Sequence, residues 1–290
     1  MYESRKMGLM FILPYLLGLV LFQLFPFAMS FFLSFTEYDI IRPPIYIGLE
    51  NYIEIYHDPL FWQSMSVTLL FVLLAVPTRL VFALFIAHVL NFKLKGINFF
   101  RTAFYLPSVL GGSVAVAVLW RILFSQNGFV NSVLDFVGIG GVSWFGNEDY
   151  ALWTIVFLHL WQFGSAMVVF LAALQSVPTS LYEAAIIDGA GRFQTFLKIT
   201  LPTITPVILF NLIMQTMFAF QEFNGPYLIT QGGPLKATYL FSMFIYEQSF
   251  RMMNLGYGSA LSWVLFAMMV VISGLIFWSS KYWVFYSGDK

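Results

Sequence analysis

A stripe of polar and aromatic residues within an apolar segment is the first candidate for binding chemistry. It consists of Asn211, Gln215, Phe218 and Glu222. The spacings of four, three and four residues place these side chains within an arc of about 60° on an α-helix. Amide and carboxylate groups can pair with sugar hydroxyls, and an aromatic ring can stack on a sugar ring. We predict that the stripe lines a substrate path; the alternative is hydrogen bonding between helices at a contact between two membrane chains.

Three further polar residues belong to the same candidate path: Arg79, Gln162 and Asn224. Arg79 lies in the middle of an apolar run, where a charge costs about 2.5 kcal/mol or more and must face a cavity or a partner. One interpretation is an internal ion pair, with Glu222 or Glu247 as partner, or a side chain that extends along its helix. The other is a positive charge offered to an anionic substrate such as an acidic saccharide.

Long apolar segments must position these residues. The chain is 60% hydrophobic and 10% charged, with 34 phenylalanines, which lies outside the range of soluble domains. Six segments reach the roughly 20 residues that a spanning helix needs. They are residues 8–34, 64–91, 102–124, 150–176, 203–226 and 257–284. The first run is too long for a cleaved signal peptide. We predict an all-α integral membrane protein with six transmembrane helices in a single domain, residues 1–290.

Lys and Arg residues near the span ends predict the orientation. If the N-terminus is cytoplasmic, the nine inner cations are Arg5, Lys6, Lys93, Lys95, Arg101, Arg192, Lys198, Lys281 and Lys290. The four outer ones are Arg42, Arg121, Lys236 and Arg251. The excess favours cytoplasmic N- and C-termini. The external segment 121–149 holds amphipathic pieces too short to span, and we expect an interfacial helix there.

Residues 178–206 form a polar segment between two spans. Ser180 and Glu183 have the spacing of a capping box, which predicts a helix start. Gly189 can take the left-handed conformation that ends this helix. A second short helix is expected over residues 190–200, with Pro202 and Pro206 beginning the next span. The expected result is a helix-turn-helix on the cytoplasmic surface.

This segment resembles the EAA loop of the membrane subunits of ATP-driven, binding-protein-dependent importers. The matching residues are Glu183, Ala184, Ala185, Asp188, Gly189, Ala190, Leu201, Pro202 and Pro206. The Gly-Gly-Pro turn at residues 232–234 is similar to that of carbohydrate-type members, of the maltose and glycerol-phosphate kind. The alternative is an ordinary capped loop, in which Glu183 only caps and Gly189 only turns.

The resemblance implies a type I ABC importer permease in a bacterial or archaeal cytoplasmic membrane. It assigns ATPase coupling to Glu183, Ala184, Ala185, Asp188, Gly189, Ala190 and Arg192. No GxxxxGK[ST] motif occurs in the chain, so ATP and Mg are expected on a separate ATPase, and this subunit is expected to bind no cofactor and catalyse no reaction. The implied partners are a second, related permease in a heterodimer, two ATPase subunits and an extracytoplasmic binding protein docked on the external loops.

The composition also bears on three other functions: metal binding, nucleic-acid binding and secondary transport. The chain has no cysteine and three scattered histidines, which gives no metal-ligand pattern, and a net charge of zero gives no reason to expect nucleic acid. A secondary transporter driven by an ion gradient is the alternative function. Such proteins usually contain internal repeats, and we find none between the two halves. The predicted function is import of a sugar or oligosaccharide by alternating access.

Overall fold

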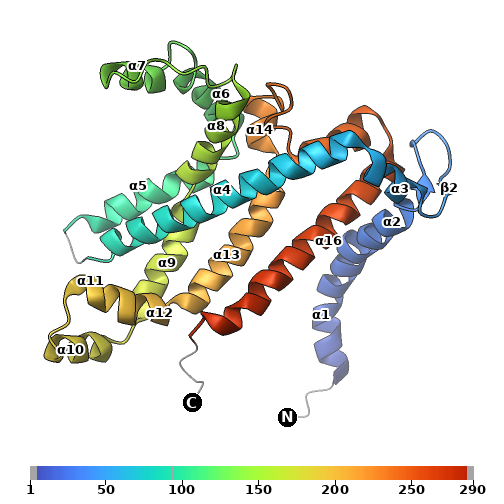
Figure 1. The fold of residues 1–290 in the computed structure, drawn as a ribbon. Coiled ribbons are helices and arrows are strands. Elements are labelled where there is room, and N and C mark those ends of the chain that lie inside the picture. Colours follow the sequence, from blue (N-terminus) through green and yellow to red (C-terminus); the bar gives the residue numbers. More distant parts are fainter. Residues whose placement is uncertain (1–4, 93–94, 286–290) are drawn as a thin grey trace. The chain divides into compact units, whose positions relative to one another are not determined.

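The computed structural model describes residues 5–92 and 95–285 and is dominated by helices (Figure 1). Residues 1–4, 93–94 and 286–290 fall outside the described residues. Two of the cations used to predict orientation, Lys93 and Lys290, are among them. The cytoplasmic location of the N- and C-termini stays a prediction.

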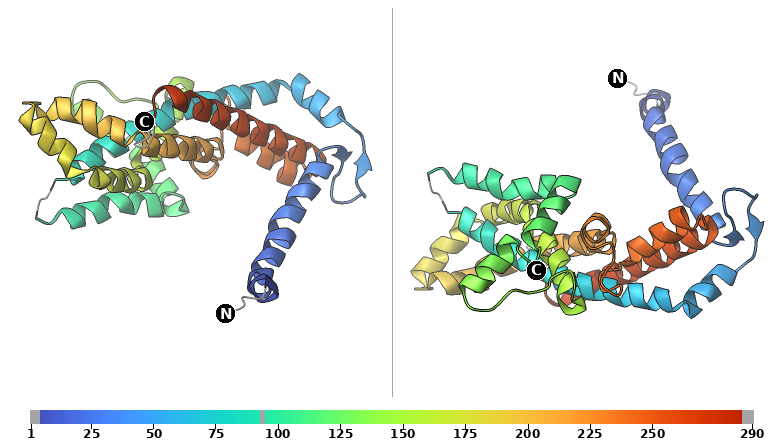
Figure 2. Two further views of the ribbon diagram at one scale, coloured as in Figure 1. Left: turned by 90° about the horizontal axis from the view of Figure 1, so that it is seen from below. Right: turned by 90° about the horizontal axis from the view of Figure 1, so that it is seen from above.

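The helices agree with the six predicted spans when each bent pair of helices is counted as one span. Three helices in the described part of the chain are long and apolar enough to cross a membrane alone: Met10–Leu33, Pro59–Leu90 (α4) and Leu255–Tyr282. The first joins α1 (Arg5–Leu19), η1 (Val20–Leu24) and α2 (Phe25–Leu33) into one rod (Figure 2), and the last comprises α16 (Leu255–Ser279) and η4 (Ser280–Tyr282).

The other three spans are bent pairs of helices. They are α5 (Ile97–Leu110) with α6 (Val114–Leu123), α8 (Glu148–Trp161) with α9 (Gly164–Ser176), and Arg192–Thr203 with Thr205–Ile229. The bends measure 102°, 43° and 66°. Because irregular backbone in a membrane must be satisfied by protein or water, each bend marks a place where polar groups gather.

The chain divides into two compact units, Met1–Phe61 with Phe244–Ala267, and Trp62–Met243 with Met268–Lys290. The single permease domain over residues 1–290 stays a prediction. In the first unit, β1 (Thr36–Glu37) pairs antiparallel with β2 (Ile45–Tyr46), and α3 (Glu50–His57) follows. Buried Asn51 donates from Nδ2 to the carbonyls of Ser34 and Thr36 at 2.9 and 3.0 Å. This segment between the first and second spans is therefore structured.

The start of α16 packs closely inside the first unit. A Cβ at Gly256 would lie 2.0 Å from the Thr36 carbonyl oxygen, and one at Gly258 would lie 2.0 Å from Ser249 Oγ. The Trp263 and Phe27 rings pack at a tilt of 52°, with ring centroids 4.7 Å apart. The small residues that begin the sixth span therefore permit close contact.

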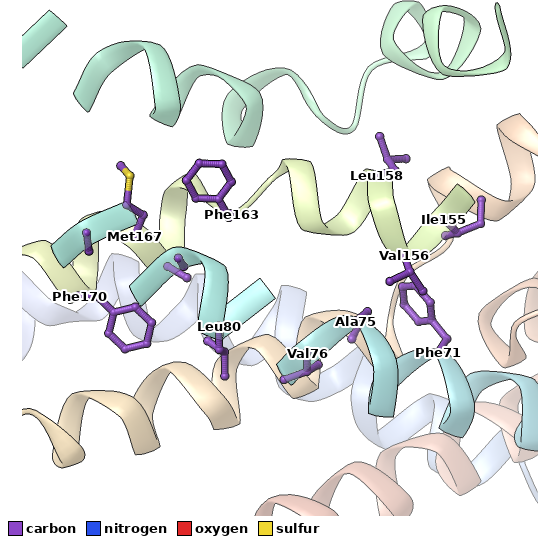
Figure 3. Close-up of a cluster of buried hydrophobic side chains, with 14 of the residues drawn as sticks. Phe71, Ala75, Val76, Leu80, Ile155, Val156, Leu158, Phe163, Met167 and Phe170 are labelled. Atoms are coloured by element: carbon purple, nitrogen blue, oxygen red, sulfur yellow. The ribbon is translucent and has the colours of Figure 1, made fainter. Parts of the chain in front are cut away.

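The core of the second unit lies between α4 and the α8–α9 pair. Figure 3 shows Phe71, Ala75 and Leu80 of α4 in one buried cluster with side chains of this pair. The labelled side chains of the pair are Ile155, Val156, Leu158, Phe163, Met167 and Phe170. Alanines at 75, 83 and 87 are fully buried, so the helices approach closely on this face.

The third span differs from the continuous helix expected over residues 102–124. It breaks at Gly111–Gly112, and Ser113 caps α6 by accepting a bond from the Val116 amide at 3.3 Å. A Cβ at Gly111 would lie 2.1 Å from the Gln162 side chain, so glycine allows α5 to meet the α8–α9 pair here. Apolar length alone did not reveal this turn.

A short helix, α7 (Phe129–Phe136), stands in segment 121–149, which is predicted to be external. Buried Asn131 fixes its base: Nδ2 donates to the Val142 carbonyl at 2.9 Å, and Oδ1 accepts from the Trp144 indole at 2.8 Å. The amphipathic helix is confirmed, and its location at the membrane surface stays a prediction. The remaining elements are α13 (Thr205–Phe220), α14 (Asn224–Ile229), α15 (Phe241–Tyr246) and η3 (Glu247–Arg251).

Candidate coupling loop and substrate path

Residues 178–206, the coupling loop, fold as a helix-turn-helix at one end of the second unit (Figures 1 and 2). The elements are α10 (Thr179–Ile187), α11 (Arg192–Thr195), η2 (Phe196–Thr200) and α12 (Leu201–Thr203). The last three run on without interruption, so the second helix extends three residues beyond the predicted end. The predicted architecture is otherwise confirmed.

The predicted capping box is wrong. Pro178 occupies the N-cap position, and the structure records no side-chain cap. Because α10 begins at Thr179, Ser180 lies inside the first turn, where its hydroxyl cannot cap. Proline fixes φ near the value found here, −59°, and turns the chain directly into the helix. Glu183 is exposed and free of a capping role.

Gly189 ends α10 as predicted, with a φ of +72°. Its amide donates to the Ile186 carbonyl at 3.1 Å, and the Ala190 amide donates to the Ala185 carbonyl at 2.9 Å. These two bonds make a Schellman motif, which satisfies carbonyls left free at the helix end. The left-handed conformation favours glycine because a Cβ is costly there.

The coupling residues assigned by resemblance have different environments. Ala185 is buried and Ala190 is partly buried, whereas Glu183, Ala184, Asp188, Gly189 and Arg192 are exposed. Sequence reasoning missed Ile186 and Ile187, whose side chains are 75% and 86% exposed. An apolar pair exposed at a polar helix end is typical of a protein contact. The signal was available, since both residues directly precede the predicted Asp188-Gly189 turn.

A hydrogen bond joins the two helical segments of the coupling loop. The Tyr182 hydroxyl lies 3.1 Å from Thr200 Oγ1, and Thr200 is buried. Phe196 packs edge-on against the His88 ring near the end of α4, with centroids 4.6 Å apart. A movement of α10 would therefore be passed to η2 and α4.

Arg79 is buried in the second unit and bonded to the bend between α8 and α9. Its Nη1 lies 3.0 Å from His159 Nε2, and its Nη2 donates to the Gln162 carbonyl at 2.5 Å and to Ser165 Oγ at 3.3 Å. Glu222 interacts with Arg79 electrostatically, although the two described side chains form no ion pair. The hydrogen-bonding partners are therefore neutral groups and not the carboxylates considered from the sequence.

Ser108 of α5 completes this bend. Its hydroxyl donates to the Gln162 carbonyl at 3.1 Å and accepts from the Ser165 amide at 2.9 Å. A Cβ at Gly164 would lie 2.6 Å from the Phe104 carbonyl oxygen, so glycine lets α9 sit directly on α5. We call Arg79, Ser108, His159, Gln162 and Ser165 the polar bend. They satisfy backbone groups that the 43° break would leave free.

Glu222 and Asn224 lie near the polar bend, where α13 gives way to α14. Glu222 Oε1 accepts a bond from the Gly225 amide at 2.9 Å. Asn224, Gly225 and Gly112 line a small shared cavity. Four predicted path residues, namely Arg79, Gln162, Glu222 and Asn224, are thus brought together by segments far apart in the sequence.

The other stripe residues lie in two environments. Asn211 and Gln215 are buried at 2% and 3% exposure, whereas Phe218 is 53% exposed. Asn211 Nδ2 and Gln215 Oε1 have no hydrogen-bond partner in the part of the chain that the structure describes. Buried amide atoms of this kind normally acquire a partner such as water or a ligand. Their role in a substrate path stays a prediction.

The second unit combines bent apolar helices with a two-helix loop at one end, an arrangement consistent with a transport permease. Residues 59–284 match the family described as binding-protein-dependent transport system inner membrane component. The chain belongs to this family, and it is an integral protein of the cytoplasmic membrane. It is thus an ABC importer permease, and the secondary-transporter alternative has no support.

Named relatives extend over nearly the whole chain. It is 48% identical to the probable ABC transporter permease protein YesP of Bacillus subtilis, covering 99% of this chain and 94% of the relative. It is 34% identical to the sulfoquinovosyl glycerol transport system permease protein SmoG of Agrobacterium fabrum, covering 94% and 89%.

A solved structure shows the same fold. It is a bacterial alginate ABC transporter in complex with a periplasmic protein bound to an alginate pentasaccharide. The TM-score is 0.80 at 21% identity, covering 95% of this chain and 94% of that chain. The expected importer permease fold is confirmed.

Proposed function

We propose that this chain is one membrane-spanning half of an importer that moves a sugar or oligosaccharide across the cytoplasmic membrane. The observation that carries the coupling role is the Schellman-terminated helix α10, which presents Ile186 and Ile187 at one end of the second unit. The family is named for dependence on a binding protein. Relatives named for sulfoquinovosyl glycerol and alginate support a saccharide as the substrate class.

The coupling loop receives movement from an ATPase. Exposed Ala184 lets a partner surface approach the α10 backbone, and Ile186 with Ile187 supplies the apolar contact. The bond between Tyr182 and Thr200 carries a displacement of α10 to the helix that leads into α13. ATP and Mg bind on the ATPase, and this chain hydrolyses nothing itself.

The substrate path runs past the polar bend and the start of α14. Gln162 and Asn224 offer amide groups, Glu222 a carboxylate, and Phe218 an exposed ring. Asn211 and Gln215, with atoms still unpaired, become part of the path when the helices open. Arg79 is occupied by three protein groups, which favours its internal role over direct contact with an anionic substrate.

The assembly that we propose contains a second, related permease in a heterodimer, two ATPase subunits and an extracytoplasmic binding protein. The binding protein contacts the external loops, among them the segment that carries β1, β2 and α3. A single chain contributes half of the path.

Uptake by proteoliposomes tests this function. The complex is reconstituted with its binding protein, and uptake of neutral and acidic oligosaccharides is measured with ATP inside, with and without an ionophore. We expect uptake that needs ATP and the binding protein and survives collapse of the ion gradients. Uptake that follows the ion gradient and ignores ATP would refute the proposal. In the same assay, Arg79→Gln should leave the preference between neutral and acidic oligosaccharides unchanged.

A further inference from the structure

A groove runs between the last turns of α4 and the coupling loop. Its more polar part, of about 460 Å³, is lined by His88, Asn91, Tyr182, Ile186, Arg192 and Thr200, among others, so it adjoins the exposed Ile186 of α10. Its apolar part, of about 500 Å³, is lined by Val81, Leu84, Phe85, Phe193 and Phe196, together with His88 and Arg192. The two parts share His88, Arg192 and Phe196, so they form one continuous groove with a polar and an apolar end.

The apolar part extends deep along a membrane span. Val81, Leu84 and Phe85 share one face of α4 with His88, at helical spacing. Val81 stands nine residues before Leu90, the last residue of α4, which is about 14 Å along the helix axis. This end of the groove therefore lies beside the hydrocarbon of the bilayer, where a water-soluble partner cannot reach.

The polar part carries positive charge without a counter-charge. The Arg192 side chain is exposed and makes no hydrogen bond or ion pair with the described residues of the chain, and no carboxylate lines either part of the groove. Asn91 adds a hydrogen-bond donor at the same end. A cation at the membrane surface above an apolar channel is complementary to an anionic lipid. A free phosphate would leave the apolar part unfilled.

We propose that this groove binds an anionic phospholipid, with an acyl chain along Val81–Phe85 and the phosphate headgroup against Arg192 and Asn91. The bound lipid fills the space between α4 and the coupling loop and supports the loop from the membrane side. This site goes beyond the proposed transport function, because lipid binding here requires neither a sugar nor ATP.

Native mass spectrometry of the purified complex tests the proposal without substrate. The complex is equilibrated in nanodiscs of equal phosphatidylglycerol and phosphatidylcholine, and the lipids retained after mild delipidation are counted. One arginine at a membrane surface corresponds to about a fivefold preference. We expect the native complex to retain phosphatidylglycerol over phosphatidylcholine by about this factor. Equal retention of the two lipids would overturn the proposal.

Two groove variants and two matched controls locate the site. Arg192→Gln should abolish the preference for phosphatidylglycerol, and Leu84→Trp should fill the apolar part and reduce retention of both lipids. Lys198→Gln removes an exposed cation of the same segment outside the groove, and Leu73→Trp adds the same bulk on an exposed position of α4 outside it. Both controls should behave as the native chain does.

Other outcomes would also overturn the site. Unchanged lipid retention in Arg192→Gln would do so even if Leu84→Trp did not assemble, because Arg192 is exposed and its replacement disturbs no packing. If phosphatidylglycerol were retained only after removal of the ATPase, the ATPase and not a lipid would occupy the groove in the complex. Failure of oligosaccharide uptake with intact lipid selectivity would instead count against the proposed function.

Discussion

The coupling loop and the polar bend both interrupt the same apolar bundle with polar groups, yet they are built in opposite ways. The loop is a run of consecutive residues, largely exposed, whose shape depends on local bonds such as those around Gly189. The polar bend is built around two buried side chains, Arg79 and His159, and takes its members from α4, α5, α8 and α9. A local motif can therefore define a docking element. A helix break inside a membrane needs several helices, because their side chains supply the hydrogen bonds that its free backbone groups require.

The comparison predicts that a change in the loop affects coupling and that a change in the bend affects stability. Coupling is measured as ATP hydrolysis stimulated by the substrate-loaded binding protein. Stability is measured as thermal unfolding of the purified complex.

The largest effect on coupling is expected for Gly189→Val. A β-branched residue at a φ of +72° costs on the order of 1–2 kcal/mol and disrupts the end of α10. Since 1.4 kcal/mol corresponds to a factor of ten in rate, stimulated ATP hydrolysis should fall by about five- to thirtyfold, with little change in thermal unfolding. Gly189→Asn should retain more activity, because asparagine tolerates this conformation.

Gly191→Ala is the matched control, since Gly191 has a φ of −70° and open space around it. It should behave as the native chain does. Equal loss of coupling in both glycine variants would show that the left-handed turn is not the cause.

Arg79→Met should be the most destabilising change in the polar bend. It removes the charged hydrogen-bond partner of His159 and Ser165, and the Gln162 carbonyl loses one of its donors. We expect the free energy of unfolding to fall by about 2–3 kcal/mol. Thr78→Ala, at an exposed neighbouring position, should have a small effect. An Arg79→Met complex as stable as the native one would contradict the structural role of Arg79.

Gly164→Val tests the contact between α5 and α9. Because a Cβ there would meet the Phe104 carbonyl oxygen at 2.6 Å, we expect a loss of about 1–3 kcal/mol, measured by thermal unfolding. Gly274→Val, where nothing lies within 4 Å, serves as control. Similar unfolding temperatures for the two variants would mean that close helix contact is unimportant at this bend.

Ser108→Ala should have the smallest effect in this series, about 1 kcal/mol, because it removes one neutral side chain that bonds the Gln162 carbonyl and the Ser165 amide. Combination with Arg79→Met is informative because both side chains bond the same carbonyl oxygen. The double variant should lose less than the sum of the two single losses. If the two losses in free energy of unfolding were strictly additive, Ser108 would act independently of Arg79 and would not belong to the polar bend.

The same contrast explains what the sequence could predict. The six spans follow from apolar length, and the turn at Gly189 follows from a local Asp-Gly signal. The partners of Arg79 could not be predicted, because His159 and Ser165 lie 80 and 86 residues away and only packing brings them near. The break at Gly111–Gly112 escaped notice because its cause, the Gln162 side chain, lies on another span. The capping box failed because Pro178 had already fixed the helix start.

Cysteine crosslinking tests the central claim most directly, namely that the coupling loop is the surface that docks an ATPase. The chain contains no cysteine, so each variant carries a single reactive site. Ile187→Cys on α10 is compared with Phe136→Cys on α7, since the native side chains are similarly exposed, at 86% and 91%. We predict that a short bifunctional reagent joins Ile187→Cys, and not Phe136→Cys, to the co-expressed ATPase. Crosslinking from Phe136→Cys alone, or equal crosslinking from both positions, would contradict the account.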